Sequence, residues 1–361
     1  MSGRNPSRFA IHSAIGGRSE QALPRDTMTL ARVLKSRGYF TAISGKWHLG
    51  LRPEVGPRKY GFDSSYGYLH GQLDQYTHLY KNGDRTWHRN DEFVDESGHA
   101  TDLIAAEAVR VIGAKRQQPF FLYVTFSVPH YPLQEEEKWL APYRATIKDE
   151  SRRLFAASVT HLDDAVGRIV KSLESSGQLS NTLVVFTSDN GGQREYHSDT
   201  DYGGKHGPNP TLGDNRPWRG WKGEMYEGGV RVPAFAYWKD RLKPRVLNEP
   251  VSAMDWLPTL AQLAGAETKS DWKLDGRNVW PLITGAQTRD EPRTLYWTDG
   301  RTSAVLDGDW KLITSQRQPQ QVELFDLASD PYETKNGAMT NAARLQALRQ
   351  RLNEELAKDA R

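Results

Sequence analysis

The most informative stretch of the chain is YFTAISGKWHLG, residues 39–50. Its first six residues form an apolar run that predicts a buried β-strand, and Lys46 and His48 follow in the loop at the carboxyl end of that strand. Open α/β sheets bind their ligands at this edge. Alternate residues of an extended segment point the same way, so Lys46 and His48 can converge on one anion, such as a sulfate or phosphate ester.

Strand-like and helical patterns alternate through the chain to about residue 285. Such alternation predicts an α/β fold in which a mostly parallel sheet is flanked by helices on both faces. The apolar run at 120–128 predicts a central strand of that sheet. We also expect a buried strand at 183–187, a further strand at 232–237, and helices at 26–38, 102–116, 154–175 and 254–263.

The pattern changes after Gly285, where short strands are separated by tight turns. These predict a small antiparallel sheet with strands at 295–297, 302–306, 310–314 and 322–327, followed by a helix at 341–358. We therefore expect a larger domain at residues 1–285 and a smaller C-terminal α+β subdomain at residues 286–361. Residues 193–215 lack periodicity and are expected to form a long loop near the site.

The composition narrows the class of protein. The 361 residues carry a formal net charge of +3, which lacks the concentrated basic character of a nucleic-acid-binding protein. Cysteine is absent, so the sequence offers no disulfide, no zinc thiolate and no cysteine nucleophile. The longest apolar stretch, residues 119–129, is too short to span a bilayer, and residue 1 does not begin a signal peptide.

Other polar side chains are expected at strand ends and in glycine-rich turns. His130 ends the predicted central strand, Asp189 and Asn190 end the strand at 183–187, and Lys222 lies between glycines in WRGWKG. Adjacent Asp and Asn supply the oxygen ligands that calcium prefers. Lysines neutralise the oxygens of a transferring sulfuryl group, and a histidine can protonate the departing alkoxide. These residue types together favour ester hydrolysis at an anionic centre.

The order of the motifs resembles the formylglycine-dependent sulfatases of the alkaline-phosphatase-like superfamily. The motifs are GKWHLG, PH, SDNGG, RGWKG and EGGVRVP, followed near the end by DWKL, ELFDL and DP. The resemblance covers nearly the whole chain. Within the family, YGFD with YGY, and VPHYPLQ, look most like the arylsulfatase B branch.

The resemblance implies a role for each residue of the site. Asp189 and Asn190 would hold one calcium ion, and Lys46 and Lys222 would hold the sulfate oxygens. His48 would bond the hydroxyl of the formylglycine, and His130 would contact the ester and donate the proton to the leaving oxygen, with Asp189 as the alternative acid.

The implied activity is that of a sulfuric ester hydrolase. Its substrate would be a sulfated carbohydrate or an aryl sulfate, and a formylglycine-generating or equivalent enzyme would mature the full-length form. No nucleic-acid partner or membrane span is expected, and export to the periplasm or outside the cell is expected from the resemblance alone.

One family element is missing from the sequence. The nucleophile is a formylglycine made from Cys or Ser in a Cys/Ser-x-Pro-x-Arg motif, and an aspartate pair precedes it. The segment RNPSR at residues 4–8 has arginine at the nucleophile position, whereas MSGR at residues 1–4 fits the turn that follows the family's nucleophile helix. We therefore expect the nucleophile, the aspartate pair and one core strand to lie upstream of this chain, with Val124 and Val184 losing packing partners. The chain alone is expected to be inactive.

Two other functions stay open on the sequence. A phosphate or phosphonate ester hydrolase of the same superfamily would use the same cations. A non-catalytic sulfoglycan-binding remnant would use Arg4 as an anion clamp. His12, His88, His99 and His161 are expected to be surface or packing residues. His70 and His78 could shape a substrate cleft, and His197 and His206 in the long loop could contact sugar, but for these four we expect solvated side chains.

Overall fold

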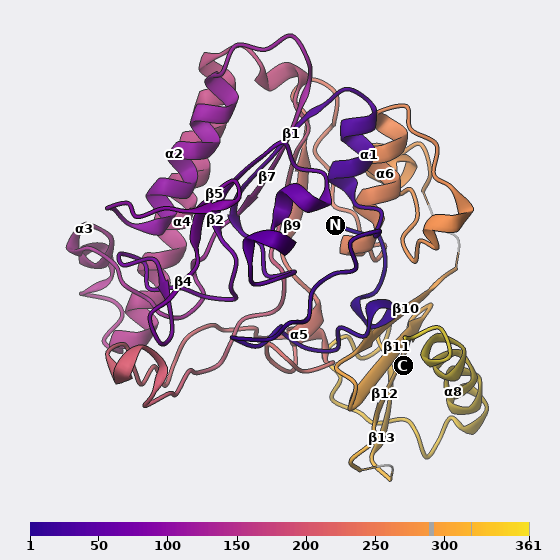
Figure 1. Cartoon of the computed structure of the whole chain (residues 1–361). Helices are drawn as coiled ribbons and strands as arrows, with labels where there is room; N and C mark the ends of the chain where they lie inside the picture. Colours follow the sequence, from indigo (N-terminus) through magenta and orange to yellow (C-terminus); the bar gives the residue numbers. More distant parts are fainter. Residues whose placement is uncertain (289–291, 319, 361) are drawn as a thin grey trace.

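The computed structural model describes residues 1–288, 292–318 and 320–360. It has the predicted α/β architecture, with a mainly parallel central sheet and a separate antiparallel sheet near the C-terminus (Figure 1). The central sheet has the strand order β6-β5-β2-β1-β7. Its strands are β1 (Phe40–Lys46), β2 (Ser64–Tyr68), β5 (Trp87–Arg89), β6 (Glu92–Phe93) and β7 (Phe120–Thr125). Strand β1 pairs in parallel with β2 and β7, whereas β5 is antiparallel to β2 and to β6.

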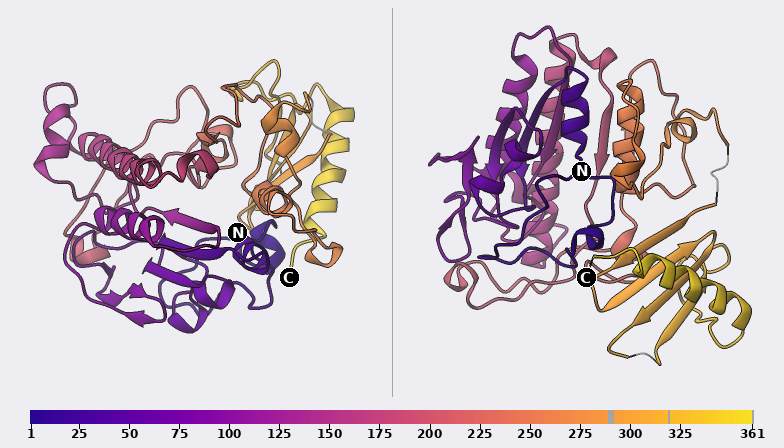
Figure 2. Two further views of the ribbon diagram at one scale, coloured as in Figure 1. Left: turned by 90° about the horizontal axis from the view of Figure 1, so that it is seen from above. Right: turned by 45° about the vertical axis from the view of Figure 1, so that its right-hand side comes forward.

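Helices cover both faces of this sheet, as the alternating pattern predicts. On one face α2 (Ala100–Gly113) lies against the strands and α4 (Glu150–Ser175) packs on α2. On the other face α1 (Leu30–Ser36) contacts β1, and α6 (Trp256–Leu263) packs on α1. The two views of Figure 2 show the same layers from above and from the side.

The boundaries of two helices differ from the prediction. Helix α1 begins at Leu30, later than the predicted start at residue 26, because the side chain of Thr29 accepts the N–H of Arg32 and so acts as the N-cap. Helix α2 begins two residues earlier than predicted, because His99 caps it through the N–H of Thr101. A cap fixes a helix start more sharply than apolar periodicity does.

The neighbours of two strands contradict the sequence analysis. Strand β7 is the outermost strand of its sheet, so the run at 120–128 is not central. Within the described residues, strand β8 (Val184–Thr187) pairs with β9 (Ala234–Tyr237) alone in an antiparallel ribbon, and it is half-buried instead of buried. Val124 and Val184 are both half-buried, and the ring of Phe235 on β9 is 52% exposed.

The C-terminal part has the predicted antiparallel sheet. Its strand order is β10-β11-β12-β13, and helix α8 lies along one face (Figure 1). The strands are β10 (Thr294–Thr298), β11 (Thr302–Asp307), β12 (Trp310–Ser315) and β13 (Val322–Asp326), and the helix is α8 (Ala342–Leu356). Val305, Leu312 and Leu324 pack with Leu348 of α8 in one core cluster.

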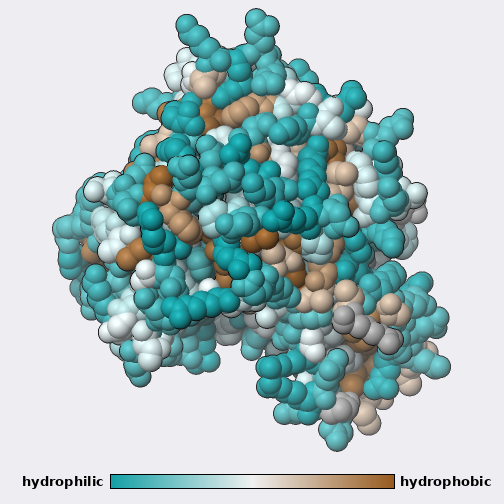
Figure 3. All heavy atoms as spheres, in the orientation of Figure 1, coloured by the Kyte–Doolittle hydropathy of each residue, from teal (hydrophilic) through white to brown (hydrophobic). Residues whose placement is uncertain are grey.

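The remaining short elements lie in the connections. They are β3 (Leu79–Tyr80), β4 (Asp84–Arg85), α3 (Glu137–Leu140), α5 (Glu227–Val230) and α7 (Trp280–Thr284). Residues 193–215 form the predicted long connection, with one 3-10 turn at Asp201–Gly204 and a bridge between Tyr196 and Asn209. Hydrophilic residues dominate the face shown in Figure 3, where hydrophobic residues surface in separate areas. Among the described residues, no helix is both long and apolar enough to cross a membrane.

Candidate functional site

The loop after β1 is held in place by one large buried side chain. Trp47 is 5% exposed and packs on Tyr60 and Phe62, and its indole N–H donates to the carbonyl of Val55 at 3.0 Å. Trp47 is thereby anchored in the core between Lys46 and His48, both of which are only half-buried. Lys46 is the last residue of β1 and His48 has a φ of +52°, so the segment is not extended as far as His48 and strand alternation does not account for the directions of the two side chains.

The glycine before Lys46 lets β1 approach β7 closely. A Cβ at Gly45 would lie 1.9 Å from the carbonyl oxygen of Thr125, and the φ of Gly45 is +119°. Only glycine adopts this conformation without strain and leaves that space free. The ends of β1 and β7, which carry Lys46 and lead to His130, are thus brought side by side.

Two lysine side chains, Lys46 and Lys222, lie close enough for the charge of Lys222 to act on Lys46. Burial lowers the pKa of Lys46 to about 8, with the charge of Lys222 acting in the same direction and the carboxylate of Asp189 opposing it. Burial also lowers the pKa of Lys222, again opposed by Asp189. Lys46, Lys222 and Asp189 come from three distant parts of the sequence, and the charges of Lys222 and Asp189 both act on the pKa of Lys46.

The two histidines of the site are held as neutral rings with opposite tautomers. Burial lowers the pKa of His48 to about 4, and the charge of Lys46 adds to this effect. Burial and the charge of Lys222, followed by that of Lys46, lower the pKa of His130 to about 3. His48 Nε2 donates to the carbonyl of Ile15 at 3.0 Å, and His130 Nδ1 donates to the carbonyl of Tyr131 at 2.7 Å. Nδ1 of His48 and Nε2 of His130 therefore carry the lone pairs.

Asp189 and Asn190 lie just beyond the end of β8. The Asp189 side chain is exposed and, within the described parts of the chain, makes no hydrogen bond or ion pair. Asn190 donates its amide nitrogen to the carbonyl of Gly191 at 2.9 Å, which leaves its Oδ1 for another partner. A Cβ at Gly191 would lie 1.8 Å from the carbonyl oxygen of Gly228, so this turn is pressed against α5. Carboxylate and amide oxygens of this kind suit a hard cation.

Several buried polar residues near the site escaped the sequence analysis. His70 and His78 are 5% and 3% exposed, which contradicts the expectation that they are solvated. His206 is also buried at its side chain and bonds the carboxylate of Asp74 at 2.8 Å, whereas His197 is exposed as expected. The tyrosine-rich composition of residues 66–80 was the available signal, but it gives no contact partners.

The RNPSR segment has a structural role in the fold. The guanidinium of Arg8 is almost fully buried and pairs with Asp275, Glu355 and Asp359 at 3.2, 2.5 and 2.5 Å. Arg4 lies over the ring of Phe9 at 4.7 Å. This segment packs the N-terminal region against the end of α8 and provides no nucleophile.

Two family models match the chain. The model named Sulfatase matches residues 1–266, and the model named N-sulphoglucosamine sulphohydrolase, C-terminal, matches residues 219–361.

Curated relatives have similar sequences. Arylsulfatase J of Mus musculus is 32% identical over 316 residues, which are 83% of this chain and 49% of that protein. N-acetylgalactosamine-6-sulfatase of Mus musculus is 32% identical over 303 residues, which are 80% of this chain and 55% of that protein. The chain thus spans about half the length of these curated relatives.

Solved structures share the fold. The structure of Ps i-CgsB in complex with k-i-k-neocarrahexaose is 29% identical with a TM-score of 0.86, and the match covers 100% of this chain and 81% of that one. The structure of BT4656 in complex with D-glucosamine-2-N,6-O-disulfate is 21% identical with a TM-score of 0.70, covering 99% and 88% of the two chains; it supports the fold alone.

Proposed function

Because the chain belongs to the sulfatase family, we propose that its site binds the sulfate group of a sulfate monoester and is the anion site of a sulfuric ester hydrolase. The observation that carries the proposal is the meeting of two ammonium groups, Lys46 and Lys222, with the neutral rings of His48 and His130. A sulfate ester keeps negative charge on its non-bridging oxygens throughout the reaction, so preorganised cations stabilise both its binding and its transition state.

The two histidines are assigned different tasks. His130 presents the lone pair of Nε2, and a bound anion would raise the pKa of its ring by offsetting the charges of Lys222 and Lys46. A ring protonated in this way can donate to the oxygen of the leaving alcohol. The lone pair of His48 is on Nδ1, and we assign this atom the role of proton acceptor next to the sulfate. Asp189 is the alternative acid.

Calcium fits the residues present in part. Asp189 and Asn190 offer two oxygen ligands, and the unpartnered carboxylate of Asp189 is the observation that favours a cation there. Calcium takes about six to eight oxygen ligands, so these side chains supply only part of a complete site. When bound, the ion would polarise a sulfate oxygen as a Lewis acid.

A formylglycine does not fit any residue of this chain. Cysteine is absent, and no serine of the chain lies in a Ser-x-Pro-x-Arg pattern. In the RNPSR segment arginine occupies the nucleophile position, and Arg4 and Arg8 are held by Phe9 and by three carboxylates. We derive no covalent step from these residues. The 361-residue chain is therefore proposed to bind the ester without turning it over.

The proposed substrate class is a sulfated carbohydrate. The relatives named above act on N-acetylgalactosamine-6-sulfate by name or were solved with a carrageenan oligosaccharide. The family's own chemistry also includes aryl sulfates, which provide a convenient probe of the anion site.

The test is an assay of the 361-residue chain with 4-nitrophenyl sulfate and 4-nitrophenyl phosphate at equal concentrations. We expect saturable binding of the sulfate ester, weaker binding of the phosphate ester, and no release of nitrophenol. Tighter binding of the phosphate would favour the phosphoester alternative. Release of nitrophenol by the purified chain, absent from a Lys46→Met, Lys222→Met double variant, would show that it contains a nucleophile and would overturn this account of its chemistry.

A further inference from the structure

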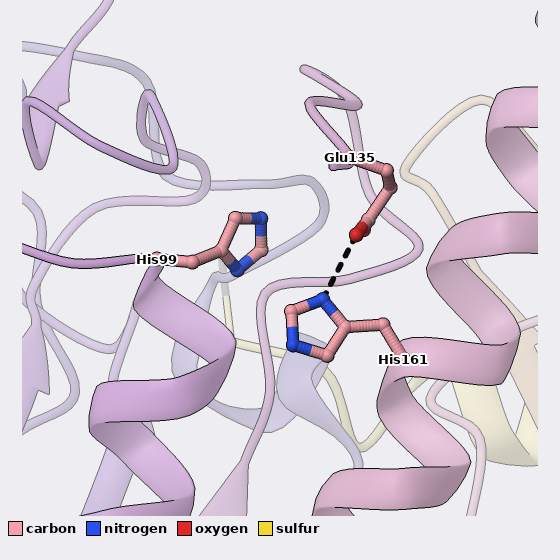
Figure 4. Close-up of side chains that lie close together, drawn as sticks. All are labelled: His99, Glu135 and His161. Carbon is pink, nitrogen blue, oxygen red and sulfur yellow. Dashed lines mark hydrogen bonds and ion pairs between the residues drawn. The ribbon is translucent and has the colours of Figure 1, made fainter. Parts of the chain in front are cut away.

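Three potential metal ligands converge away from the sulfate site. His99 immediately precedes α2, Glu135 lies in the segment between β7 and α3, and His161 is inside α4. One ligand atom from each lies within 4.8 Å of the other two (Figure 4). We propose that His99, Glu135 and His161 form a binding site for one divalent transition-metal ion of the Zn²⁺ type.

The carboxylate of Glu135 is buried and incompletely satisfied. Its side chain has no exposed surface, and Oε2 accepts a hydrogen bond from Nδ1 of His161 at 2.8 Å. Its second oxygen, Oε1, is buried and has no hydrogen-bond partner. An unpaired oxygen of a buried carboxylate is costly. A cation between Glu135 and the two rings would satisfy it.

The ring of His99 is fixed by backbone groups on both of its nitrogens. Its Nε2 donates to the carbonyl of Gln134 at 2.9 Å, which places the lone pair on Nδ1. A backbone acceptor on the distal nitrogen fixes the tautomer and orients the ring of a metal ligand. In the metal-free protein Nδ1 accepts the N–H of Thr101 at 3.2 Å. Coordination would replace this long hydrogen bond.

His161 has a carboxylate facing each of its nitrogens. Nδ1 bonds Glu135, and Nε2 lies 3.3 Å from Oδ1 of Asp102. Asp102 is in turn held by Arg168 of the same helix at 2.6 Å. A metal ion would replace the proton on Nδ1 and leave the N–H of Nε2 directed at Asp102. This is the carboxylate–histidine–metal arrangement of many zinc sites.

The donor set selects the class of ion. Two imidazoles and one carboxylate suit Zn²⁺ and its neighbours in the first transition series, whereas calcium prefers an all-oxygen shell. The site is therefore chemically distinct from Asp189 and Asn190. Its three elements include the segment that follows His130, so the bound ion would tie that segment to α2 and α4.

The test is titration of the purified 361-residue chain with ZnCl₂ against a chromogenic zinc chelator, repeated with Co²⁺ for its visible spectrum. We expect one ion per chain and a rise in melting temperature. Glu135→Gln and His161→Gln should each weaken binding at least about 100-fold. His197→Gln, an exposed histidine beside Glu195, is the matched control and should leave affinity unchanged.

A second variant keeps the test decisive if a ligand variant fails to fold. Asp102→Asn retains all three ligands and removes only the negative charge that lies 3.3 Å from Nε2 of His161, so it should weaken binding about 10–100-fold. Absence of 1:1 binding, or affinity that is the same in Glu135→Gln, His161→Gln and Asp102→Asn as in the unaltered chain, would overturn the proposal. His161 would then be a protonated bridge between Glu135 and Asp102.

Discussion

The imidazole of His48 packs directly on the backbone of Gly71. A Cβ added at Gly71 would lie 2.6 Å from Cε1 of His48 and 2.9 Å from its Nε2. Nε2 is the atom that donates to the carbonyl of Ile15. The ring therefore packs on one side against Gly71, which has no Cβ, and is held on the other side by the carbonyl that Nε2 bonds. These two contacts fix the position of Nδ1 before any ligand binds.

Substituting Gly71→Ala should displace His48. We expect a loss of about 1–3 kcal/mol in the free energy of unfolding, because the added methyl group meets a packed ring, together with weaker binding of an aryl sulfate. Gly167→Ala in α4 is the matched control: nothing lies within 4 Å of its added Cβ, and alanine should stabilise the helix by up to about 1 kcal/mol. Urea denaturation of both variants checks the pair, and equal stability of Gly71→Ala and the unaltered chain would contradict the packing.

The tautomers of His48 and His130 are a second prediction. Long-range ¹H–¹⁵N spectra at pH 7 should show His48 as the Nε2–H form and His130 as the Nδ1–H form, because each bonds a backbone carbonyl through that nitrogen. Both rings should stay neutral until the pH falls to about 4 for His48 and about 3 for His130, since burial lowers each pKa. A ring that titrates near pH 6.5 would show that its site is hydrated.

Lys311 of β12 connects the C-terminal sheet to α5, and its substitution tests that contact. Its side chain is fully buried, and Nζ lies 2.9 Å from Glu227 and 2.9 Å from Glu333. Lys311→Met leaves Glu333 without this cation and leaves Glu227 with the exposed Arg231 at 3.7 Å, so we expect a loss of about 3–5 kcal/mol. Lys335→Met, at an exposed position, should change stability by less than about 0.5 kcal/mol.

The loss in Lys311→Met should depend on pH. Burial raises the pKa of Glu333 even with Lys311 present, because it outweighs the opposing charge of that lysine. Without the lysine the pKa rises further, and the folded state then holds a proton that the unfolded state releases. The variant should therefore be most destabilised near pH 8 and less so near pH 5. Urea denaturation of the variant and of the unaltered chain at pH 5 and pH 8 measures this dependence. If the difference in their free energies of unfolding is the same at both pH values, the carboxylate of Glu333 is not buried as described.

The pH dependence of anion binding is a further prediction. Lys46 has a pKa of about 8, lowered by burial and by Lys222. Its ammonium is present below that pH and is lost above it, so affinity for an aryl sulfate should fall as the pH rises from 7 to 9. Isothermal titration at several pH values measures this fall. The fall should be absent in Lys46→Met, and its persistence there would assign the titration to another group.

Sequence patterns predicted most of the elements but not the neighbours of every strand. A continuous apolar run located β1, which is buried along its whole interior. Helical periodicity located α4, and short apolar runs between tight turns located the four strands of the C-terminal sheet. The apolar run at 120–128 forms β7, yet it lies at the edge of its sheet. Hydrophobic composition reports how much apolar surface a strand carries, and it does not report which strand lies beside it.

Residue types and the order of the motifs are the only signals that the sequence offers for the candidate site. The strand end pointed to Lys46 and His48, although His48 lies beyond β1 with a φ of +52°, and motif order added His130, Asp189, Asn190 and Lys222. Neither could give the tautomers, which depend on the carbonyls of Ile15 and Tyr131. The sequence also has no pattern that predicts the cluster of His99, Glu135 and His161, because these residues come from three separate elements and meet only in the fold.

The most direct test of the central claim is the affinity of the purified chain for 4-nitrophenyl sulfate, measured by equilibrium dialysis at pH 7. The variants Lys46→Met and Lys222→Met should each weaken binding about tenfold or more, because each ammonium makes a charge-assisted contact with the anion. Lys239→Met, an exposed lysine of β9's trailing turn, should bind as the unaltered chain does. If both site variants keep full affinity, the two lysines do not form the sulfate site.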